Sequence, residues 1–395
     1  MKMRLQGLCA GIFALLIWAA PAAGEPYIAI REGLKCSQCH ANITGGGMRT
    51  VYANTYSQQE LPMTYYAPWK DLPAPGSGEA SDKASKETEA IRRRTDQLLS
   101  GQVTDFLSWG TDLRFSNETQ AVPNADNTNT FSVGEATLYL QGVLIPDHLY
   151  VYLDALWESS MAGGPAAREV FGLIRGLPLE GYIKAGKFFV PHGLRLQDDS
   201  AFIRSSLPGA YNMTASEVGV EAGIEPGPLS LSVAVTNGNN SNVDSNADKQ
   251  VNLLGTIVQE NFRVGGSFAF NPGMGSDYIR SENGFGGFTY GRFTLLGEFD
   301  HAKQRTGGAV SGSQALLGEL NVLLTQGLNA KASYEFYNPS LAVAKDEQNR
   351  WSFILECFVT QFAQARAGAR ILDNRKPSPW SADGEIYFAE LHFFL

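Results

Sequence analysis

The stretch Leu328-Asn329-Ala330-Lys331-Ala332-Ser333-Tyr334-Glu335-Phe336-Tyr337 sets an apolar or small side chain at every second position. The intervening positions carry Asn, Lys, Ser, Glu and Tyr. A period of two predicts a β-strand with one apolar face and one polar face. The same alternation occurs in residues 149–158 and 385–395, so strands of this kind are expected along much of the chain.

This pattern divides the chain from residue 104 to residue 395 into about sixteen candidate strands. We place them near residues 104–117, 132–145, 148–159, 167–175, 181–190, 215–225, 229–237, 250–259, 262–271, 283–290, 292–302, 314–324, 327–338, 350–360, 363–372 and 384–395. A soluble β-sandwich or a large periplasmic β domain would also alternate in this way. The lengths of the connections decide between these folds.

The connections alternate between short turns and longer loops. Short turns are expected at residues 146–147, 225–228, 260–261, 291, 326 and 361–362. Longer loops are expected at residues 119–130, 191–214, 238–249, 272–282, 303–313, 339–349 and 373–383. This rhythm is typical of an outer-membrane barrel, whose short turns face the periplasm. We therefore predict an all-β fold, a transmembrane antiparallel β-barrel of about 16 strands, with the loop at 191–214 on the cell surface and Asp198 and Asp199 exposed.

The strand charges fall on the face opposite the apolar one. The acids are Glu135, Asp154, Glu217, Glu221, Glu298, Asp300, Glu319, Glu335, Glu356 and Glu390, and the bases are Arg114, Lys184, Arg263, Lys331, Arg366 and Arg370. A charge facing lipid near mid-membrane costs about 2–4 kcal/mol, so this face is predicted to line the lumen. The excess of acids disfavours an anion channel and suits cations.

The chain begins with the features of a secretory signal peptide. Lys2 and Arg4 precede an apolar run at residues 8–20, and small residues at 22–24 provide a cleavage site. We expect the mature chain to begin at Glu25. The predicted organisation is a signal peptide at 1–24, a short segment at 25–69, a polar linker at 70–103 and the barrel at 104–395. The net charge of −9 argues against a nucleic-acid partner.

Residues 36–40 read Cys36-Ser37-Gln38-Cys39-His40, a CxxCH motif. Two thiols at this spacing reach both vinyl groups of a c-type haem, and the adjacent histidine is its proximal iron ligand. We predict one covalent haem c held by Cys36, Cys39 and His40. A disulfide between the cysteines, a redox CxxC and a zinc site are the alternatives. Met63 or Met48 is a candidate distal ligand, or else fills an apolar gap.

The segment at 25–69 is too short to enclose a large apolar group by itself, since chains below about 40 residues rarely build a core unaided. We therefore expect it to dock inside or across the periplasmic mouth of the barrel and to restrict solute flow.

Two stretches resemble known families. Gly186-Lys187-Phe188-Phe189-Val190-Pro191-His192-Gly193-Leu194 is similar to a strand and loop of phosphate-selective-type porins. Residues 26–49, one CxxCH and a following barrel together resemble the fused monohaem cytochrome–porins of the outer membrane, the iron-oxidase-like family. The run Gly45-Gly46-Gly47 after the motif differs from the proline-containing stretch of the iron oxidases.

The second resemblance implies electron transfer in the bacterial cell outer membrane, between an extracellular donor or acceptor and periplasmic carriers such as soluble cytochromes. An Fe(II)-oxidase-like activity is one form of this function. The partners would include outer-membrane lipid and the outer-membrane barrel assembly machinery, since the aromatic C-terminal strand resembles the signal that this machinery reads. The alternative is a solute-diffusion porin with an accessory N-terminal haem.

Overall fold

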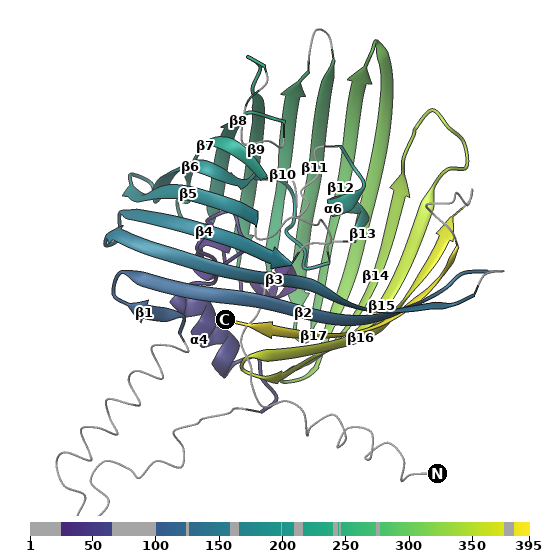
Figure 1. Cartoon of the computed structure of the whole chain (residues 1–395), viewed down its shortest axis with the longest axis horizontal. Helices are drawn as coiled ribbons and strands as arrows, with labels where there is room; N and C mark the ends of the chain where they lie inside the picture. Colours follow the sequence, from purple (N-terminus) through teal and green to yellow (C-terminus); the bar gives the residue numbers. More distant parts are fainter. Residues whose placement is uncertain are drawn as a thin grey trace, which may run out of the picture.

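The fold is a closed antiparallel β-barrel with polypeptide inside it (Figure 1). The computed structural model describes residues 25–64, 100–123, 126–158, 166–198, 200–208, 216–239, 244, 246–273, 277–374 and 383–395. The predicted signal peptide at 1–24 and most of the predicted linker lie outside these residues. Of the described helices, none has the length and apolar character needed to cross a bilayer.

Within the described ranges the sheet contains 17 strands, of which β1 (Gln102–Thr104) is a short addition paired with β2. The others are β2 (Leu107–Ala121), β3 (Thr128–Ile145), β4 (Leu149–Glu158), β5 (Ala166–Leu177), β6 (Gly181–Phe189), β7 (Ser216–Ile224), β8 (Leu229–Thr236), β9 (Gln250–Gln259), β10 (Phe262–Pro272), β11 (Tyr278–Tyr290), β12 (Phe293–Thr306), β13 (Ala309–Thr325), β14 (Leu328–Asn338), β15 (Gln348–Thr360), β16 (Ala363–Asn374) and β17 (Gly384–Phe394). Each pairs with the next, and β17 pairs with β2, which closes a barrel of 16 strands and confirms the predicted fold class.

One predicted loop is wrong. Residues 303–313 are not a long loop, because β12 and β13 run on to a two-residue turn at Gly307 and Gly308. Both glycines have positive φ, +58° and +88°, which a tight two-residue hairpin turn requires. At 14 and 17 residues these strands exceed the 9–11 residues that span a bilayer, so the hairpin projects beyond the membrane.

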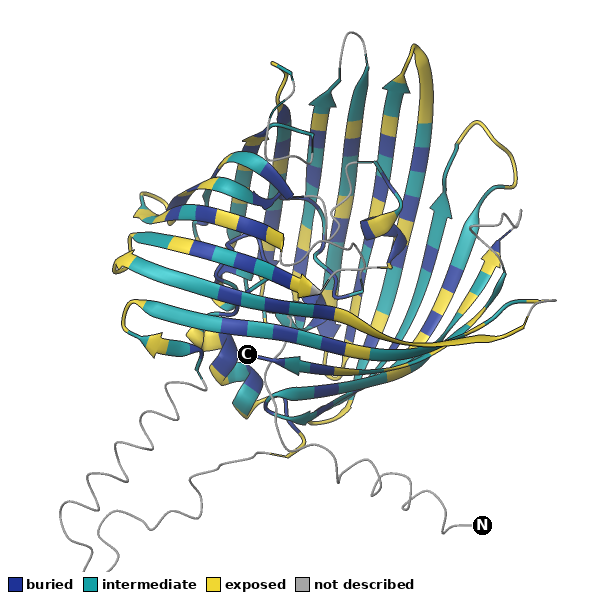
Figure 2. Ribbon diagram, viewed as in Figure 1, coloured by how far each residue is buried: buried dark blue, intermediate teal, exposed yellow. Residues whose placement is uncertain are grey.

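The outer face of the barrel wall carries apolar side chains and the lumenal face carries the charged ones, as predicted. Apolar side chains such as Phe293 and Leu295 are exposed, whereas Glu298 and Asp300 of the same strand are buried. Buried positions recur between more exposed ones along the strands of the wall (Figure 2). Every acid and base predicted for the lumen is buried or half-buried. Two buried lumenal cations, Arg168 and Arg350, and two buried acids, Asp112 and Glu169, were missed. The cations form ion pairs with lumenal acids, and the excess of acids over bases on the strands is unchanged.

Residues 25–64, here called the lumenal segment, lie inside the barrel at its short-turn end (Figure 1). The segment comprises α2 (Pro26–Arg31), α3 (Cys36–Cys39) and α4 (Val51–Gln59). The backbone of Met63 donates to the Phe358 carbonyl at 2.8 Å, beside the β15–β16 turn. Tyr27 is fully buried and bonds to Glu356 of β15. The expectation that this segment docks at the periplasmic mouth is confirmed.

A second segment enters the lumen from the connection between β6 and β7. Residues 190–208, here called the inward loop, include the short helix α6 (Phe202–Ser205). The prediction that this loop lies on the cell surface is wrong, and Asp198 is held by Arg350 and Arg370 of the wall. The loop turns inward because its apolar side chains are buried there. They pack with Tyr27 and Ile30 of the lumenal segment, and they belong to Leu194, Leu196, Phe202, Ile203 and Leu207. Asp199 lies outside the described residues.

The path of the inward loop depends on Gly193. Its φ is +53°, and a Cβ there would lie 1.9 Å from Glu298 Oε1. Only glycine brings the backbone this close to β12 without strain. The close approach lets the Leu194 N–H donate to Glu298 Oε2 at 2.6 Å, which fixes the loop to the wall.

Candidate functional site

The CxxCH motif forms one helical turn. Residues three apart on a helix share a face, so α3 directs Cys36 and Cys39 to the same side. The turn is capped at its start, where the Lys35 N–H donates to Gln38 Oε1 at 2.8 Å. The backbone N–H of His40 donates to the Cys36 carbonyl at 2.9 Å. Both thiols are free, so the structure contains no disulfide between them.

After His40 the chain reverses direction through the three glycines. Gly45, Gly46 and Gly47 all have positive φ, between +66° and +95°, which allows a tight return. The Ala41 N–H then donates to the Met48 carbonyl at 2.9 Å. His40 and Arg49 become antiparallel bridge partners, so this return places a cation beside the imidazole.

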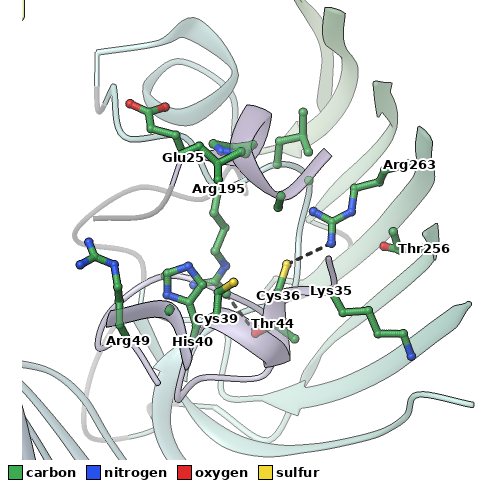
Figure 3. Close-up of a pocket in the computed structure, with 18 of the residues that line it drawn as sticks. Glu25, Lys35, Cys36, Cys39, His40, Thr44, Arg49, Arg195, Thr256 and Arg263 are labelled. Carbon is green, nitrogen blue, oxygen red and sulfur yellow. Dashed lines mark hydrogen bonds between the residues drawn. The ribbon is translucent and has the colours of Figure 1, made fainter. Parts of the chain in front are cut away.

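The motif faces a pocket inside the barrel with about 970 Å³ of space free of protein atoms, part of it open to solvent. Cys36, Cys39 and His40 line it, together with apolar side chains of the lumenal segment and of the wall, among them Ile28, Leu61, Leu254 and Phe285. Arg49, Arg195 and Arg263 also line it (Figure 3).

Burial keeps the imidazole of His40 neutral. Desolvation, followed by the charge of Arg49, lowers the pKa of His40 to about 4. A hydrogen bond with the Gly47 backbone raises this pKa only in part. Burial likewise raises the pKa of the Cys39 thiol to about 11. At neutral pH the site therefore presents a neutral imidazole, the form that binds a metal ion.

The carboxylate of Glu25, which lines the pocket, is paired with two cations of the wall. Glu25 lies 2.9 Å from Lys331 Nζ and 3.6 Å from Arg366 Nη1. Burial by itself would raise the pKa of Glu25, but these two cations outweigh it and hold the pKa below its ordinary value. Glu25 thus anchors the start of the lumenal segment to β14 and β16.

Neither candidate distal ligand lines the pocket. Met48 is 2% exposed and packs with Ile43, Tyr139 and Tyr152 against the wall. Met63 is 49% exposed, and its Sδ lies 3.1 Å from Cys357 Sγ at the short-turn rim. A ligand role for either methionine stays a prediction, and the present arrangement does not bring them together with His40.

Two cations at the site were not foreseen. Arg49 follows the glycine run in sequence, but only the reversal of the chain brings it to His40. Arg195 reaches the pocket because the inward loop folds into the lumen, where its Nη2 donates to Thr44 Oγ1 at 3.3 Å. Arg263 had been assigned to the lumen from strand alternation. Leu194 and Leu196 flank Arg195 in the sequence, and this apolar pattern could have indicated that the loop is buried.

Comparison with known proteins identifies the fold. No family model matches the chain, and no curated protein matches it. Solved structures do match, and each comparison covers 73% of this chain. The anion-selective porin from Comamonas acidovorans matches over 99% of its own length with a TM-score of 0.59 and 10% identity.

Two further solved structures match the same fold. OmpF of Salmonella typhi, solved in complex with daunomycin, matches over 97% of its length with a TM-score of 0.57 and 13% identity. A loop-deletion mutant of OmpT, an outer membrane protein of Vibrio cholerae, matches over 99% with a TM-score of 0.55 and 11% identity. The chain therefore has the fold of the outer-membrane porins, which places it in the bacterial outer membrane.

Proposed function

We propose that this barrel carries one covalent haem c in its lumenal pocket and transfers electrons across the outer membrane. The single observation behind the proposal is that both thiols and the imidazole of the CxxCH turn open onto one pocket inside the barrel. The extracellular partner is an electron donor or acceptor, with ferrous iron as one candidate. The periplasmic partners are soluble carriers such as cytochromes, and the barrel assembly machinery inserts the strands.

The residues present fit a haem of this type. Cys36 and Cys39 are free thiols on one face of α3, and each S–H adds across a vinyl group without an external oxidant. His40 offers a half-buried imidazole that desolvation keeps neutral. The pocket provides apolar walls and three arginines. When bound, the group would supply a one-electron change at its iron.

The place of the site in the barrel favours electron transfer over free diffusion. The lumenal segment and the inward loop pack against each other through Tyr27, Ile30 and Phe202. Both segments occupy lumen that solutes would otherwise cross.

The second candidate is a solute-diffusion porin whose N-terminal haem is accessory. It is favoured by the fold comparison, because the neighbours include the anion-selective porin and OmpF. The charges of the lumen do not favour either candidate, since many of the acids are paired with bases, as in Lys184–Glu221 and Arg366–Glu390.

A haem-stained gel combined with a redox titration of outer-membrane fractions tests the haem that both candidates contain. The two candidates differ in sealed vesicles, where an impermeant reductant outside should reduce a carrier inside only if the barrel transfers electrons. We expect the full-length barrel to stain for covalent haem and to change its absorption spectrum reversibly with reductant. The Cys36→Ala/Cys39→Ala variant should insert as a barrel without staining, and Cys357→Ala should stain like the unaltered protein. Staining retained in the double variant, or an absence of staining in the unaltered protein, would overturn the proposal.

A further inference from the structure

Three arginines from three different parts of the chain converge on the pocket. Arg49 comes from the lumenal segment, Arg195 from the inward loop and Arg263 from β10 (Figure 3). Each reaches the pocket by a separate route, so local sequence does not explain why they meet. Their guanidinium groups surround the thiols and the imidazole of the motif.

Arg49 has the clearest need for a partner. It is 4% exposed, and neither terminal nitrogen has a hydrogen-bond partner among the described residues. The carboxylate that most affects it, Asp112, accepts two bonds from Arg114 and lies 2.9 Å from His392. Burial lowers the pKa of Arg49 to about 10, and Asp112 offsets only part of that effect. The guanidinium carbon lies 5.0 Å from the centre of the Phe394 ring, a contact that stabilises the cation but gives its terminal N–H groups no hydrogen-bond acceptor. An anionic ligand would supply those acceptors.

The other two arginines are held in place by hydrogen bonds. Arg263 Nη2 donates to the Leu34 carbonyl and to Cys36 Sγ, both at 3.4 Å, and its Nε has no partner among the described residues. These acceptors carry no charge, so the Arg263 guanidinium keeps its positive charge at the pocket. Arg195 Nη2 donates to the carbonyls of Phe189 and Val190 at 3.0 and 3.3 Å, which positions its guanidinium at the pocket.

The charge of the lining is therefore unbalanced. Of the described residues that line the pocket, Glu25 is the one carboxylate, and it is engaged by Lys331 and Arg366. The ammonium group of Lys35 bonds to the Glu225 and Leu229 carbonyls instead of pointing to the motif. The pocket thus suits an apolar ligand with anionic arms, and the planar fork of arginine matches a carboxylate in two bonds.

The geometry points to Arg49, supported by Arg263 and Arg195, as the binding site for the carboxylate arms of the pocket's ligand, the two propionates of a haem. This inference rests on the proposed function, because it takes the ligand to be the haem held by the CxxCH turn. Reduction of the iron lowers its positive charge by one. A buried cation nearby stabilises the reduced form, so Arg49 raises the reduction potential.

The test is a spectroelectrochemical titration of purified full-length barrels in detergent. For Arg49→Gln we expect the ratio of reduced to oxidised haem at a fixed ambient potential to fall roughly tenfold, equal to a shift of about 59 mV for one electron. Arg49→Lys keeps the charge without the fork and should lie between the two. Arg280→Gln removes an exposed arginine paired with Glu282, far from the pocket, and should leave the potential unchanged.

The outcomes separate the two hypotheses. If the unaltered protein carries no haem, the proposed function fails and this inference fails with it. If all variants carry haem and Arg49→Gln has the potential of the unaltered protein, the inference alone is overturned. If Arg49→Gln does not fold as a barrel, Arg263→Gln takes its place, because Arg263 lies on a different element of the same pocket. An unchanged potential in that variant would likewise overturn the inference.

Discussion

Asn42 of the lumenal segment donates a buried hydrogen bond of 2.8 Å to Glu169 of β5. Its side-chain carbonyl accepts a bond of 3.0 Å from Lys184 of β6, and Lys184 also pairs with Glu221 at 2.8 Å. A single neutral side chain therefore bridges an acid and a base on the wall. Only an amide has both a donor and an acceptor in the positions that this bridge needs.

Asn42→Asp should loosen the lumenal segment. The aspartate loses the donor to Glu169 and sets a second carboxylate against it, which we expect to reduce the free energy of docking by about 1–3 kcal/mol. Single-channel conductance in planar bilayers should rise. Asn117→Asp is the matched control, because Asn117 is only half-buried and its side chain bonds to residues of β3 outside the lumenal segment. Equal conductance in both variants would contradict this role for Asn42.

Deletion of residues 25–69 should open a wider pore and remove haem staining together. The segment fills the short-turn end of the lumen and is fixed there by Glu25, Tyr27 and Asn42. Conductance of the truncated barrel should exceed that of Asn42→Asp, in which the segment is loosened but still present. If the truncated and full-length barrels conduct equally, the segment does not restrict the pore.

Trypsin added to intact cells should cut after Lys345 and leave the inward loop whole. Lys345 is exposed in the loop between β14 and β15, on the long-loop side of the barrel. Arg204 of the inward loop is 4% exposed, and Arg195 is partly buried against Phe189. Mass spectrometry should detect a fragment that begins at Asp346, and Lys345→Gln should abolish it. Cleavage at Arg195 or Arg204 would mean that the loop reaches the surface after all.

Asp198 should hold the inward loop in place across neutral pH. It lies 3.0 Å from Arg370 and 3.2 Å from Arg350. Burial would raise the pKa of Asp198, but these cations outweigh it and hold the pKa below its ordinary range. A lowered carboxyl pKa contributes stability that is complete above about pH 4 and is lost as the pH falls through the lowered value.

Conductance of the unaltered barrel should therefore stay constant from pH 8 to about pH 5 and change only in stronger acid. Asp198→Asn should already show the altered conductance at pH 7, with the loop less stable by about 1–3 kcal/mol. Asp147→Asn, in the exposed turn between β3 and β4, is the control. A similar pH profile for Asp198→Asn and the unaltered protein would exclude this role.

The strands of the barrel wall could be predicted from sequence because the alternation of apolar and polar side chains is a property of neighbouring residues. A strand with lipid on one side and a lumen on the other shows its alternation within a few residues, and β14 follows the pattern of Leu328 to Tyr337 throughout. Strand ends were less predictable. Gly307 and Gly308 carry β12 into β13 beyond the membrane, where no lipid enforces the alternation.

The contents of the lumen were predicted only in part. The CxxCH turn is readable from five residues, and the shortness of the lumenal segment was enough to predict that it docks. Its actual partners were not readable, since Asn42 and Glu169 are 127 residues apart. The inward loop was misassigned because loop length was weighed without its apolar content. Leu194, Leu196 and Phe202 would form an unusual exposed cluster on a cell surface.

The contacts of the lumenal segment also determine the order in which the protein can assemble. Tyr27 bonds to Glu356, which follows it by 329 residues, while Asn42 needs β5 and β6. The surface that binds the lumenal segment therefore exists only when nearly all of the strands are in place. Contacts between residues so far apart in the sequence form late in folding. The thiols of Cys36 and Cys39 are exposed during that interval and are half-buried at its end. A group as large as a haem is therefore joined to them more easily before the barrel closes around the segment.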